Sequence, residues 1–302
     1  MSPSVFLAGL ATIIIWGMSP VATKFAVLGF APLTMAAART LIGALAALPL
    51  IFLLRLPLPE DWPRRRLLMA SGAGGFILFP LLFTLGMSLT SGIHGAMILA
   101  FLPVTTGAIA HFWDRKWPDL FWWLGCALAL AGEFVLIHSR TVTGANGGEI
   151  LGDLYVWASL SFASLGYVAG ARLTRSGYKA QAVTYWGIIL ASLALLGFTP
   201  WLFSNINWQA IPLTSWLGLI YMGPPVSVLG YVLWYFALAK GGIEKVGLFQ
   251  FFQPLVGVMA AALLLQEALS PWLYLAVLMI LSGVFVATRG RNLFQTFERR
   301  AQ

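Results

Sequence analysis

The two halves of this chain match each other at a fixed offset of 151 residues, with no gap across residues 101–135. Apolar identities arise by chance in a hydrophobic chain, so the matches of Pro103 with Pro254 and of Gly132 with Gly283 carry the most weight. The other matched pairs are Phe101 with Phe252, Ala110 with Ala261, Leu124 with Leu275, Leu130 with Leu281, Phe134 with Phe285 and Val135 with Val286. We therefore expect two copies of one structural unit.

The composition predicts a membrane protein. Apolar residues make up 60% of the 302 residues and charged residues only 9%, a balance that no soluble core requires. A spanning helix needs about 20 mostly apolar residues, and continuous rather than alternating apolarity favours helices over a barrel. We expect an all-α membrane protein with ten transmembrane helices, at 6–27, 32–54, 67–89, 93–113, 120–138, 151–173, 182–203, 216–239, 246–265 and 272–288.

An odd number of spans in each half inverts the second half relative to the first. The predicted units are a first five-helix repeat at 1–139, a linker at 140–150, a second repeat at 151–289 and a tail at 290–302. Inverted repeats of this kind are typical of secondary transporters, which bind their substrate where the repeats meet.

The positive residues behind the net charge of +8 are distributed as expected for an oriented membrane protein rather than for a nucleic-acid-binding protein. Fifteen lysines and arginines fall in connections and the tail on one side of the predicted bundle, against Arg140 alone on the other. This asymmetry places both termini in the cytoplasm. We interpret the surplus positive residues as setting the orientation of the protein in the membrane and as contacting membrane lipids.

Proline and glycine interrupt many of the predicted spans. Such breaks are tolerated in a membrane only where protein or water satisfies the freed carbonyls, so they indicate an interior position. The fifth and tenth spans contain no proline, and Gly125, Ala129 and Gly132 permit close packing of the fifth. We expect those two spans at the periphery or at an oligomer contact. The predicted hinges are Gly17, Pro20, Pro80, Pro103, Pro224 and Pro254.

Lys24, Arg39 and Glu133 are the charged residues expected at bilayer depth within predicted spans. Each costs about 2.5–3.5 kcal/mol on insertion scales, which makes them functional candidates. In a structural interpretation, Lys24 extends to the surface, and Lys24 or Arg39 pairs with Glu133 or with carbonyls. In a functional interpretation, Lys24 or Arg39 holds a substrate carboxylate. Because the first span offers Lys24 and no acid, proton-driven export of cationic drugs is disfavoured.

Aromatic and amide side chains form the predicted binding site. Gln250 and Gln253 share one helix face just before Pro254, and a buried amide requires a partner. His94, Met97 and Phe101 occupy a comparable face before Pro103. The remaining candidates are Trp16, Phe79, Phe83 and Tyr231. The three histidines are too scattered for a metal site and no catalytic motif is present, so we expect neither a cofactor nor an enzyme.

The segment WGMSPVATKFA, with Trp16, Gly17 and Lys24, and the segment APLTMAAAR, ending at Arg39, resemble the drug/metabolite transporter superfamily in its EamA branch. The segments around Pro103 and Pro254 match it as well. The chain is most similar to aromatic amino acid exporters of the YddG type, which implies a multi-pass protein of the bacterial inner membrane. In one departure, Arg115 and Lys116 stand where the family often has Gly and Glu, whereas the second half has Gln266 and Glu267.

The sequence thus predicts a secondary transporter that exports aromatic or amphipathic amino acids, or related small metabolites, by alternating access. Uptake or exchange of organic anions on Lys24 and Arg39 is an alternative, and a passive channel or a membrane scaffold is another. With no obvious buried acid along the pathway, facilitated diffusion is favoured slightly over proton drive. The expected partners are a small-molecule substrate and lipids, and no oligomer is required.

Overall fold

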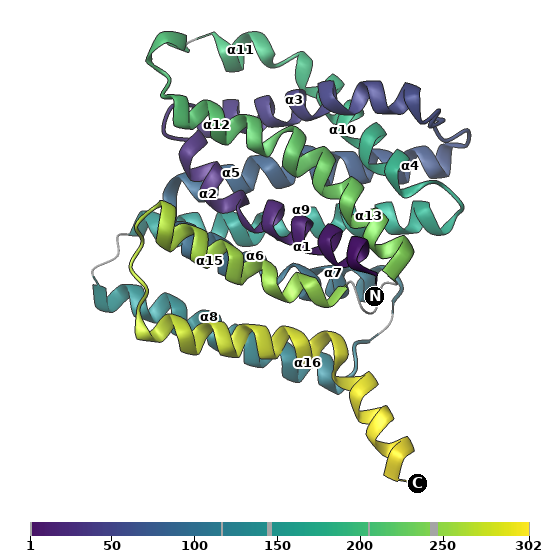
Figure 1. Ribbon diagram of the computed structural model, residues 1–302, viewed down its shortest axis with the longest axis vertical. Coiled ribbons are helices and arrows are strands. Elements are labelled where there is room, and N and C mark those ends of the chain that lie inside the picture. Colours follow the sequence, from purple (N-terminus) through teal and green to yellow (C-terminus); the bar gives the residue numbers. More distant parts are fainter. Residues whose placement is uncertain (1, 116, 144–146, 205, 242–246, 302) are drawn as a thin grey trace.

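The computed structural model describes residues 2–115, 117–143, 147–204, 206–241 and 247–301, and these ranges contain helices and no strand (Figure 1). The first half contains α1 (Pro3–Gly17), α2 (Ser19–Ala26), α3 (Pro32–Leu53), α4 (Trp62–Ala73), η1 (Gly74–Leu78), α5 (Phe79–Leu89), α6 (Gly92–Leu99), α7 (Leu102–Trp113) and α8 (Leu120–Thr143). The second half contains α9 (Gly147–Arg175), α10 (Ala180–Leu196), α11 (Thr199–Phe203), η2 (Trp208–Ala210), α12 (Leu213–Met222), η3 (Pro225–Leu229), α13 (Gly230–Gly241), η4 (Gly247–Phe252), α15 (Gln253–Leu264) and α16 (Pro271–Ala301).

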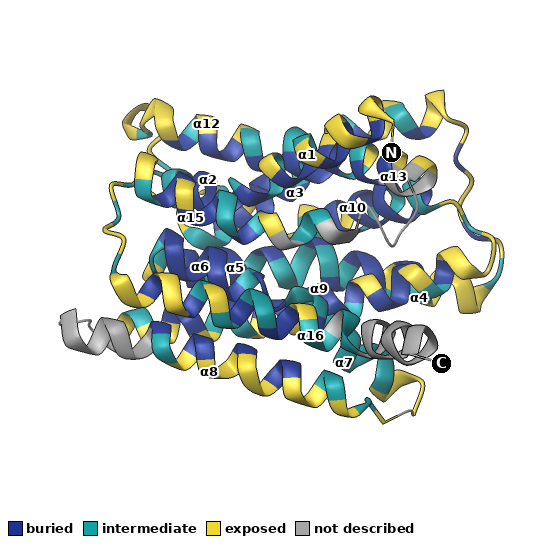
Figure 2. Cartoon of the chain, turned by 60° about the horizontal axis from the view of Figure 1, so that its bottom comes forward, coloured by how far each residue is buried: buried dark blue, intermediate teal, exposed yellow. Residues whose placement is uncertain are grey.

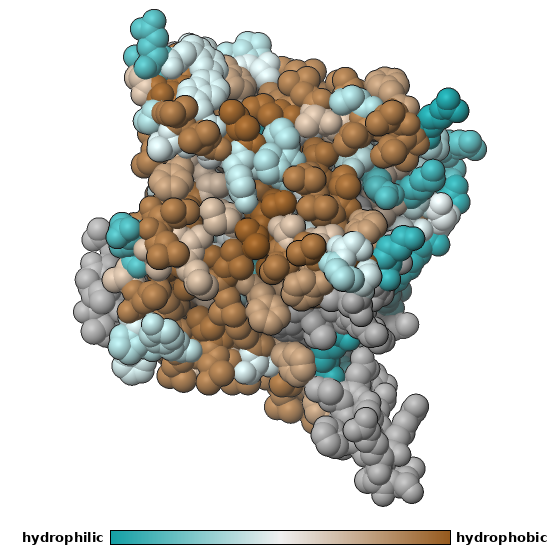
Figure 3. Space-filling model, viewed as in Figure 1, coloured by the Kyte–Doolittle hydropathy of each residue, from teal (hydrophilic) through white to brown (hydrophobic). Residues whose placement is uncertain are grey.

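Six helical stretches in the described ranges are long and apolar enough to cross a membrane: Pro3–Ala26, Pro32–Leu53, Trp62–Leu89, Gly92–Trp113, Gly148–Arg175 and Leu213–Trp234. Four shorter apolar helices cover Leu120–Leu136, Ala180–Leu196, Gln253–Leu264 and Pro271–Ala287. Each of these ten stretches overlaps one predicted segment. The side of the bundle is a broad apolar surface, with polar residues gathered toward its edges (Figure 3). A membrane is the solvent that such a surface requires.

The sequence repeat extends to the details of the backbone. The π-helix η1 at Gly74–Leu78 recurs 151 residues later as the π-helix η3 at Pro225–Leu229. At the same offset, α7 at Leu102–Trp113 recurs as α15 at Gln253–Leu264. After these two helices, Arg115 and Gln266 both adopt a positive φ, of 51° and 56°. The two halves therefore share their helix irregularities as well as their helices.

The carbonyls that the π-helices release find donors on neighbouring helices. Thr40 donates its hydroxyl to the carbonyl of Phe76 in η1 at 2.9 Å. In the second half, the indole nitrogen of Trp16 donates to the carbonyl of Val226 in η3 at 3.1 Å. The breaks predicted from Gly and Pro thus lie against protein, as a helix in a membrane requires.

Helices α8 and α16 are continuous and lie together as an outer layer (Figure 1). They run antiparallel, because Gly125 faces Ala287 while Gly132 faces Ile280. A Cβ atom on Gly125 would lie 2.2 Å from the Ala287 nitrogen, so only glycine permits this approach. α8 exposes much of its outer face in Figure 2, as expected for a peripheral span.

The predicted linker and the predicted tail are both largely helical. Helix α8 continues to Thr143 and α9 begins at Gly147, so most of the predicted linker is helical, and its residues 144–146 lie outside the described residues. Helix α16 continues to Ala301 through most of the predicted tail. Polarity marks where an apolar segment ends, whereas a helix ends at capping or breaking residues. The tail after Gly290 contains no Gly or Pro.

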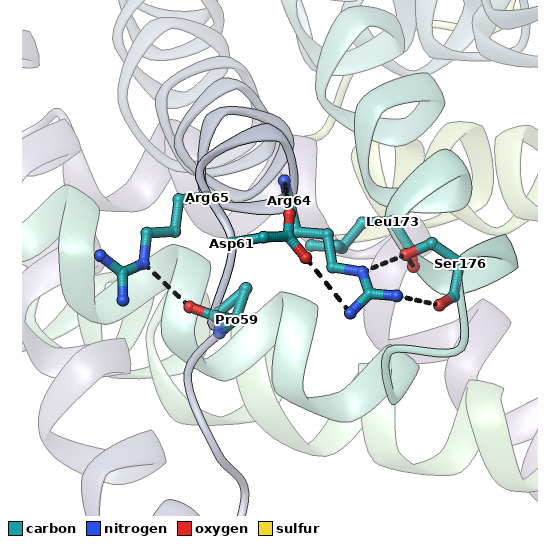
Figure 4. A network of polar contacts seen from close by, with 6 residues as sticks. All are labelled: Pro59, Asp61, Arg64, Arg65, Leu173 and Ser176. Carbon is teal, nitrogen blue, oxygen red and sulfur yellow. Dashed lines mark hydrogen bonds and ion pairs between the residues drawn. The ribbon is translucent and has the colours of Figure 1, made fainter.

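A polar network joins the start of α4 to the end of α9 (Figure 4). Asp61 caps α4 by accepting from the backbone nitrogen of Arg64 at 2.8 Å. The Arg64 guanidinium donates to the hydroxyl and the carbonyl of Ser176, at 3.2 and 2.9 Å. Nearby, Tyr178 donates to the carbonyl of Pro57, and burial raises the pKa of its phenol to about 12. The phenol therefore remains a donor at neutral pH, and two connections on this side are held together.

Candidate functional site

A cavity of about 640 Å³ lies between the two halves of the chain. This volume falls in the range typical of sites for small molecules. Helices from both halves contribute lining residues: Trp16, Gly17, Pro20, Ala96, Leu99, Ala100, Leu102, Pro103, Thr106, Gly107 and Ala110 from the first, and Tyr167, Ala171, Tyr231, Trp234, Gln250, Gln253, Pro254, Leu281, Val284 and Arg289 from the second.

The cavity extends from the middle of the bundle toward one of its ends. Along α6 and α7 the lining begins at Ala96 and continues to Ala110, and along α9 it includes Tyr167 and Ala171 near the helix end. The start of α1 and the end of α16 lie toward this same end of the bundle (Figure 1). We call it the terminal side, and the other end the far side.

Three aromatic rings form one wall of the cavity. The ring of Trp16 meets Tyr231 edge-on at 5.1 Å between centroids and lies 5.6 Å from the ring of Trp234. Because the Trp16 nitrogen is bonded to the η3 backbone, this ring is fixed in place. The wall offers a flat apolar solute a surface for stacking.

Two amide side chains face the same space. Gln250 lies in the 3₁₀-helix η4 and Gln253 begins α15, and both line the cavity. The two residues are three apart across the junction of these helices, and both contribute to the same lining. Neither amide is hydrogen-bonded to another described residue, so their donors and acceptors are available to a solute.

A hydroxyl pair and a cation lie beside the rings. The hydroxyls of Tyr167 and Tyr231 are 3.4 Å apart. Arg39 of α3 is only 5% exposed and does not line the cavity, but its charge interacts electrostatically with both tyrosines. Arg39 thus lies behind the tyrosine pair, rather than in direct contact with the cavity as the sequence had suggested.

Five further predicted residues lie elsewhere. Phe83, Met97 and Phe101 are at most 1% exposed and belong to the main apolar core, and Phe79 stacks on Phe83 at 5.4 Å. His94 lies in a separate polar network. The reason is helical geometry: His94, Met97 and Phe101 share one face, whereas Ala96, Leu99 and Pro103 present another face to the cavity.

A largely buried polar network connects helices on the far side. The Lys24 ammonium donates to the carbonyl of Thr90 at 2.8 Å, and the Thr90 hydroxyl donates to the Asp153 carboxylate. The second oxygen of Asp153 lies 3.3 Å from Nδ1 of His94. Asp153 is 3% exposed, which makes it a buried acid of α9 that the sequence reasoning did not name, although it does not line the cavity. Its position just inside the sixth predicted span was an available signal.

Glu267 adds a second connection across the far side. Its carboxylate accepts from the backbone nitrogens of Gly92 and Ile93, at 2.6 and 2.8 Å. These nitrogens are the first of α6, where a negative charge is stabilised by the helix dipole. The connection that follows α15 is thereby attached to the start of α6.

The predicted hinges coincide with irregular backbone. Gly17 and Pro20 flank the break between α1 and α2, and Pro80 follows η1. Pro224 precedes η3, while Pro103 and Pro254 lie in the first turns of α7 and α15. A Cβ atom on Gly17 would lie 2.7 Å from Val256, so the break also lets α15 approach α1. Motion at these residues stays a prediction.

The sequence reasoning left Tyr167 and Trp234 out of the predicted site. The repeat itself carried the signal for Tyr167, which lies 151 residues after Trp16, just as Ala171 lies 151 residues after Pro20. All four residues line the cavity. Applying the repeat offset to each candidate would have found Tyr167.

Comparisons with known proteins agree with this geometry. The model of the EamA-like transporter family matches residues 3–137 and again residues 150–289. The chain is 30% identical to the uncharacterized transporter YdeK of Bacillus subtilis (strain 168), with 90% of this chain and 92% of that protein covered. It is 25% identical to a probable amino-acid metabolite efflux pump of Escherichia coli (strain K12), with 93% of both covered.

A solved crystal structure shares the fold, with a TM-score of 0.65 at 21% identity over 95% of this chain and 99% of the other. The family match covers both halves of the chain and its two segments correspond to the two halves that share the cavity. The chain therefore belongs to the EamA-like transporter family, within the drug/metabolite transporter superfamily.

Proposed function

We propose that the protein exports aromatic or amphipathic amino acids, or closely related small metabolites, by alternating access. The observation that carries the proposal is the cavity between the two halves, where a wall of aromatic rings faces two amides with no described partner. Such a site suits a solute with a flat apolar part and a polar part. Two relatives named as probable amino-acid metabolite efflux pumps support the substrate class.

The proposed architecture is ten spans in two inverted five-helix repeats, with both termini cytoplasmic in the inner membrane. Its support is the shared offset of 151 residues, the antiparallel course of the equivalent helices α8 and α16, and the positive charge of the terminal side. In this orientation the cavity extends toward the cytoplasm, from which an exporter loads its substrate.

Transport then requires the far-side network to open while the cavity closes on the terminal side. The irregular backbone at Gly17, at η1, at η3 and before Pro254 provides places where helices bend. Because the repeats are equivalent, bending at matched positions in the two halves exchanges which side is open.

Counterflow in proteoliposomes tests the proposal. Liposomes loaded with unlabelled phenylalanine are diluted into labelled phenylalanine, and label uptake is compared with that of unloaded and protein-free liposomes. A carrier accelerates label entry when the opposite side is loaded, and we expect this acceleration. Equal entry in loaded and unloaded liposomes would indicate a channel, and no entry for any of the twenty amino acids would reject amino acid export.

A further inference from the structure

Arg39 is a buried cation without a described anion. It is 5% exposed, its Nη1 has no hydrogen-bond partner, and no carboxylate of the described residues forms an ion pair with it. A guanidinium inside a membrane protein is costly unless it is paired. The acid that the sequence offered as a partner, Glu133, lies on the outer helix α8 and does not pair with Arg39. Among the described residues, no anion compensates the charge of Arg39.

The surroundings of Arg39 lead to the cavity. Its neighbour Thr40 is bonded to the carbonyl of Phe76, and the Phe76 ring lies 6.4 Å from that of Tyr231. The phenols of Tyr231 and Tyr167 interact with the Arg39 charge from the cavity side. Tyr167 is 38% exposed although it lies on an inner helix, because it faces the open cavity. The tyrosine pair therefore couples the Arg39 charge electrostatically to the cavity.

The Tyr167 and Tyr231 hydroxyls are well placed to move aside or to donate. Their contact at 3.4 Å is long for a hydrogen bond between hydroxyls. Each hydroxyl can then donate to an anion in the cavity. Arg39 behind them supplies the charge, and hydrogen bonds to charged groups are the stronger ones.

We propose that Arg39, Tyr167 and Tyr231 form a carboxylate-binding subsite of the cavity, so that the substrates of this transporter carry a carboxylate. This proposal rests on the proposed function, since it assigns one end of the same solute. The aromatic part would stack on Trp16 and Trp234, and the amides of Gln250 and Gln253 would hold the remaining polar group. Tyr167 had no assigned role before this.

A series of analogues tests the subsite on the unmodified protein. Phenylalanine, phenylalaninamide, phenethylamine and phenylpropionate compete with labelled phenylalanine in counterflow. We expect the two compounds that lack a carboxylate to compete at least about tenfold more weakly, and phenylpropionate to retain competition. Equal competition by phenylalaninamide overturns the subsite but leaves amino acid export intact. Absence of counterflow for all compounds rejects the transport proposal itself.

Variants connect the selectivity to the named residues. Tyr167→Phe combined with Tyr231→Phe removes both hydroxyls and keeps the rings, and Arg39→Gln removes the charge. We expect each to lower the preference for phenylalanine over its amide, while Arg39→Lys restores part of it. Arg66→Gln, an exposed arginine of α4, is the matched control. The preference is a ratio, so a purely structural loss of active protein leaves it unchanged, and an unchanged ratio in the folded tyrosine variant overturns the proposal.

Discussion

Single residues in this chain are informative where their polar atoms lack partners. Gln250 and Gln253 are such residues, because both line the cavity and neither amide is bonded to a described neighbour. Most other polar side chains within the bundle are already engaged, as Thr40 is with the Phe76 carbonyl in η1 and Ser227 is with the Met222 carbonyl in α12. A solute entering the cavity therefore meets the two glutamines as open hydrogen-bonding groups.

Replacing either glutamine by alanine is expected to weaken transport without unfolding the protein. Each lost hydrogen bond costs about 0.5–1.5 kcal/mol of binding, roughly a threefold to tenfold rise in the substrate concentration for half-maximal counterflow. The control is Gln209→Ala, which removes an exposed amide in η2. Wild-type concentration dependence in both Gln250→Ala and Gln253→Ala would exclude them from the site.

Sequence alone located these two amides but misplaced Met97 and Phe101. The glutamines were recognisable because an amide in an apolar segment demands a partner, whatever the packing. For Met97 and Phe101 the sequence defines a helix face but leaves open which neighbour that face meets. Their burial in the core depends on how α6 and α7 are rotated against their neighbours, which is a property of tertiary packing.

At the scale of helices, small residues determine how closely elements pack. The antiparallel pair of α8 and α16 depends on Gly125 and Gly283, each of which lies against the backbone of the other helix. Lipid is as apolar as leucine, so this pair is held by close contact rather than by hydrophobic burial. The absence of proline from both segments led us to expect them at the periphery or at an oligomer contact, and the structure places both as continuous helices in an outer layer.

Gly283→Ala is expected to destabilise the protein by about 1–3 kcal/mol, because its Cβ would lie 2.4 Å from the Ala129 nitrogen and force the helices apart. The measurement is thermal unfolding in detergent. Gly197→Ala is the control, since nothing lies within 4 Å of its added Cβ. If both variants unfold at the same temperature, close approach of α8 and α16 is not what stabilises this pair.

The positions of the helix breaks were predictable from the sequence, but their π-helical geometry was not. Gly and Pro marked where η1 and η3 interrupt their spans, because these residues weaken an α-helix wherever they occur. That both breaks are π-helical, and that Thr40 and Trp16 satisfy them, depends on donors from segments far away in the sequence. Long-range partners of this kind leave no local pattern.

At the scale of the whole molecule, the structure combines a cavity on the terminal side with a polar network on the far side. The offset of 151 residues, readable in the sequence, accounts for why two halves contribute equivalent helices to one cavity. The polar network on the far side was not readable, because it joins Lys24, His94 and Asp153 from three spans with Thr90 from a connection. A carrier exchanges such states only if they differ by a few kcal/mol.

Weakening the far-side network should therefore shift the population toward the state that is open on the far side. Asp153→Asn keeps the shape of the side chain but removes the charge that faces the Thr90 hydroxyl and His94, with a loss of about 1.5 kcal/mol or more. That corresponds to roughly a tenfold shift between two states.

The shift is measured by labelling a cysteine in the cavity. Leu99→Cys, in a Cys126→Ser background, reports on cavity access through an impermeant maleimide added to either side of oriented vesicles. We expect Asp153→Asn to slow labelling from the terminal side and to speed it from the far side, whereas Glu60→Gln, at an exposed acid before α4, leaves both rates unchanged. Identical labelling in the Asp153 variant and its parent would show that this network does not hold the far side closed.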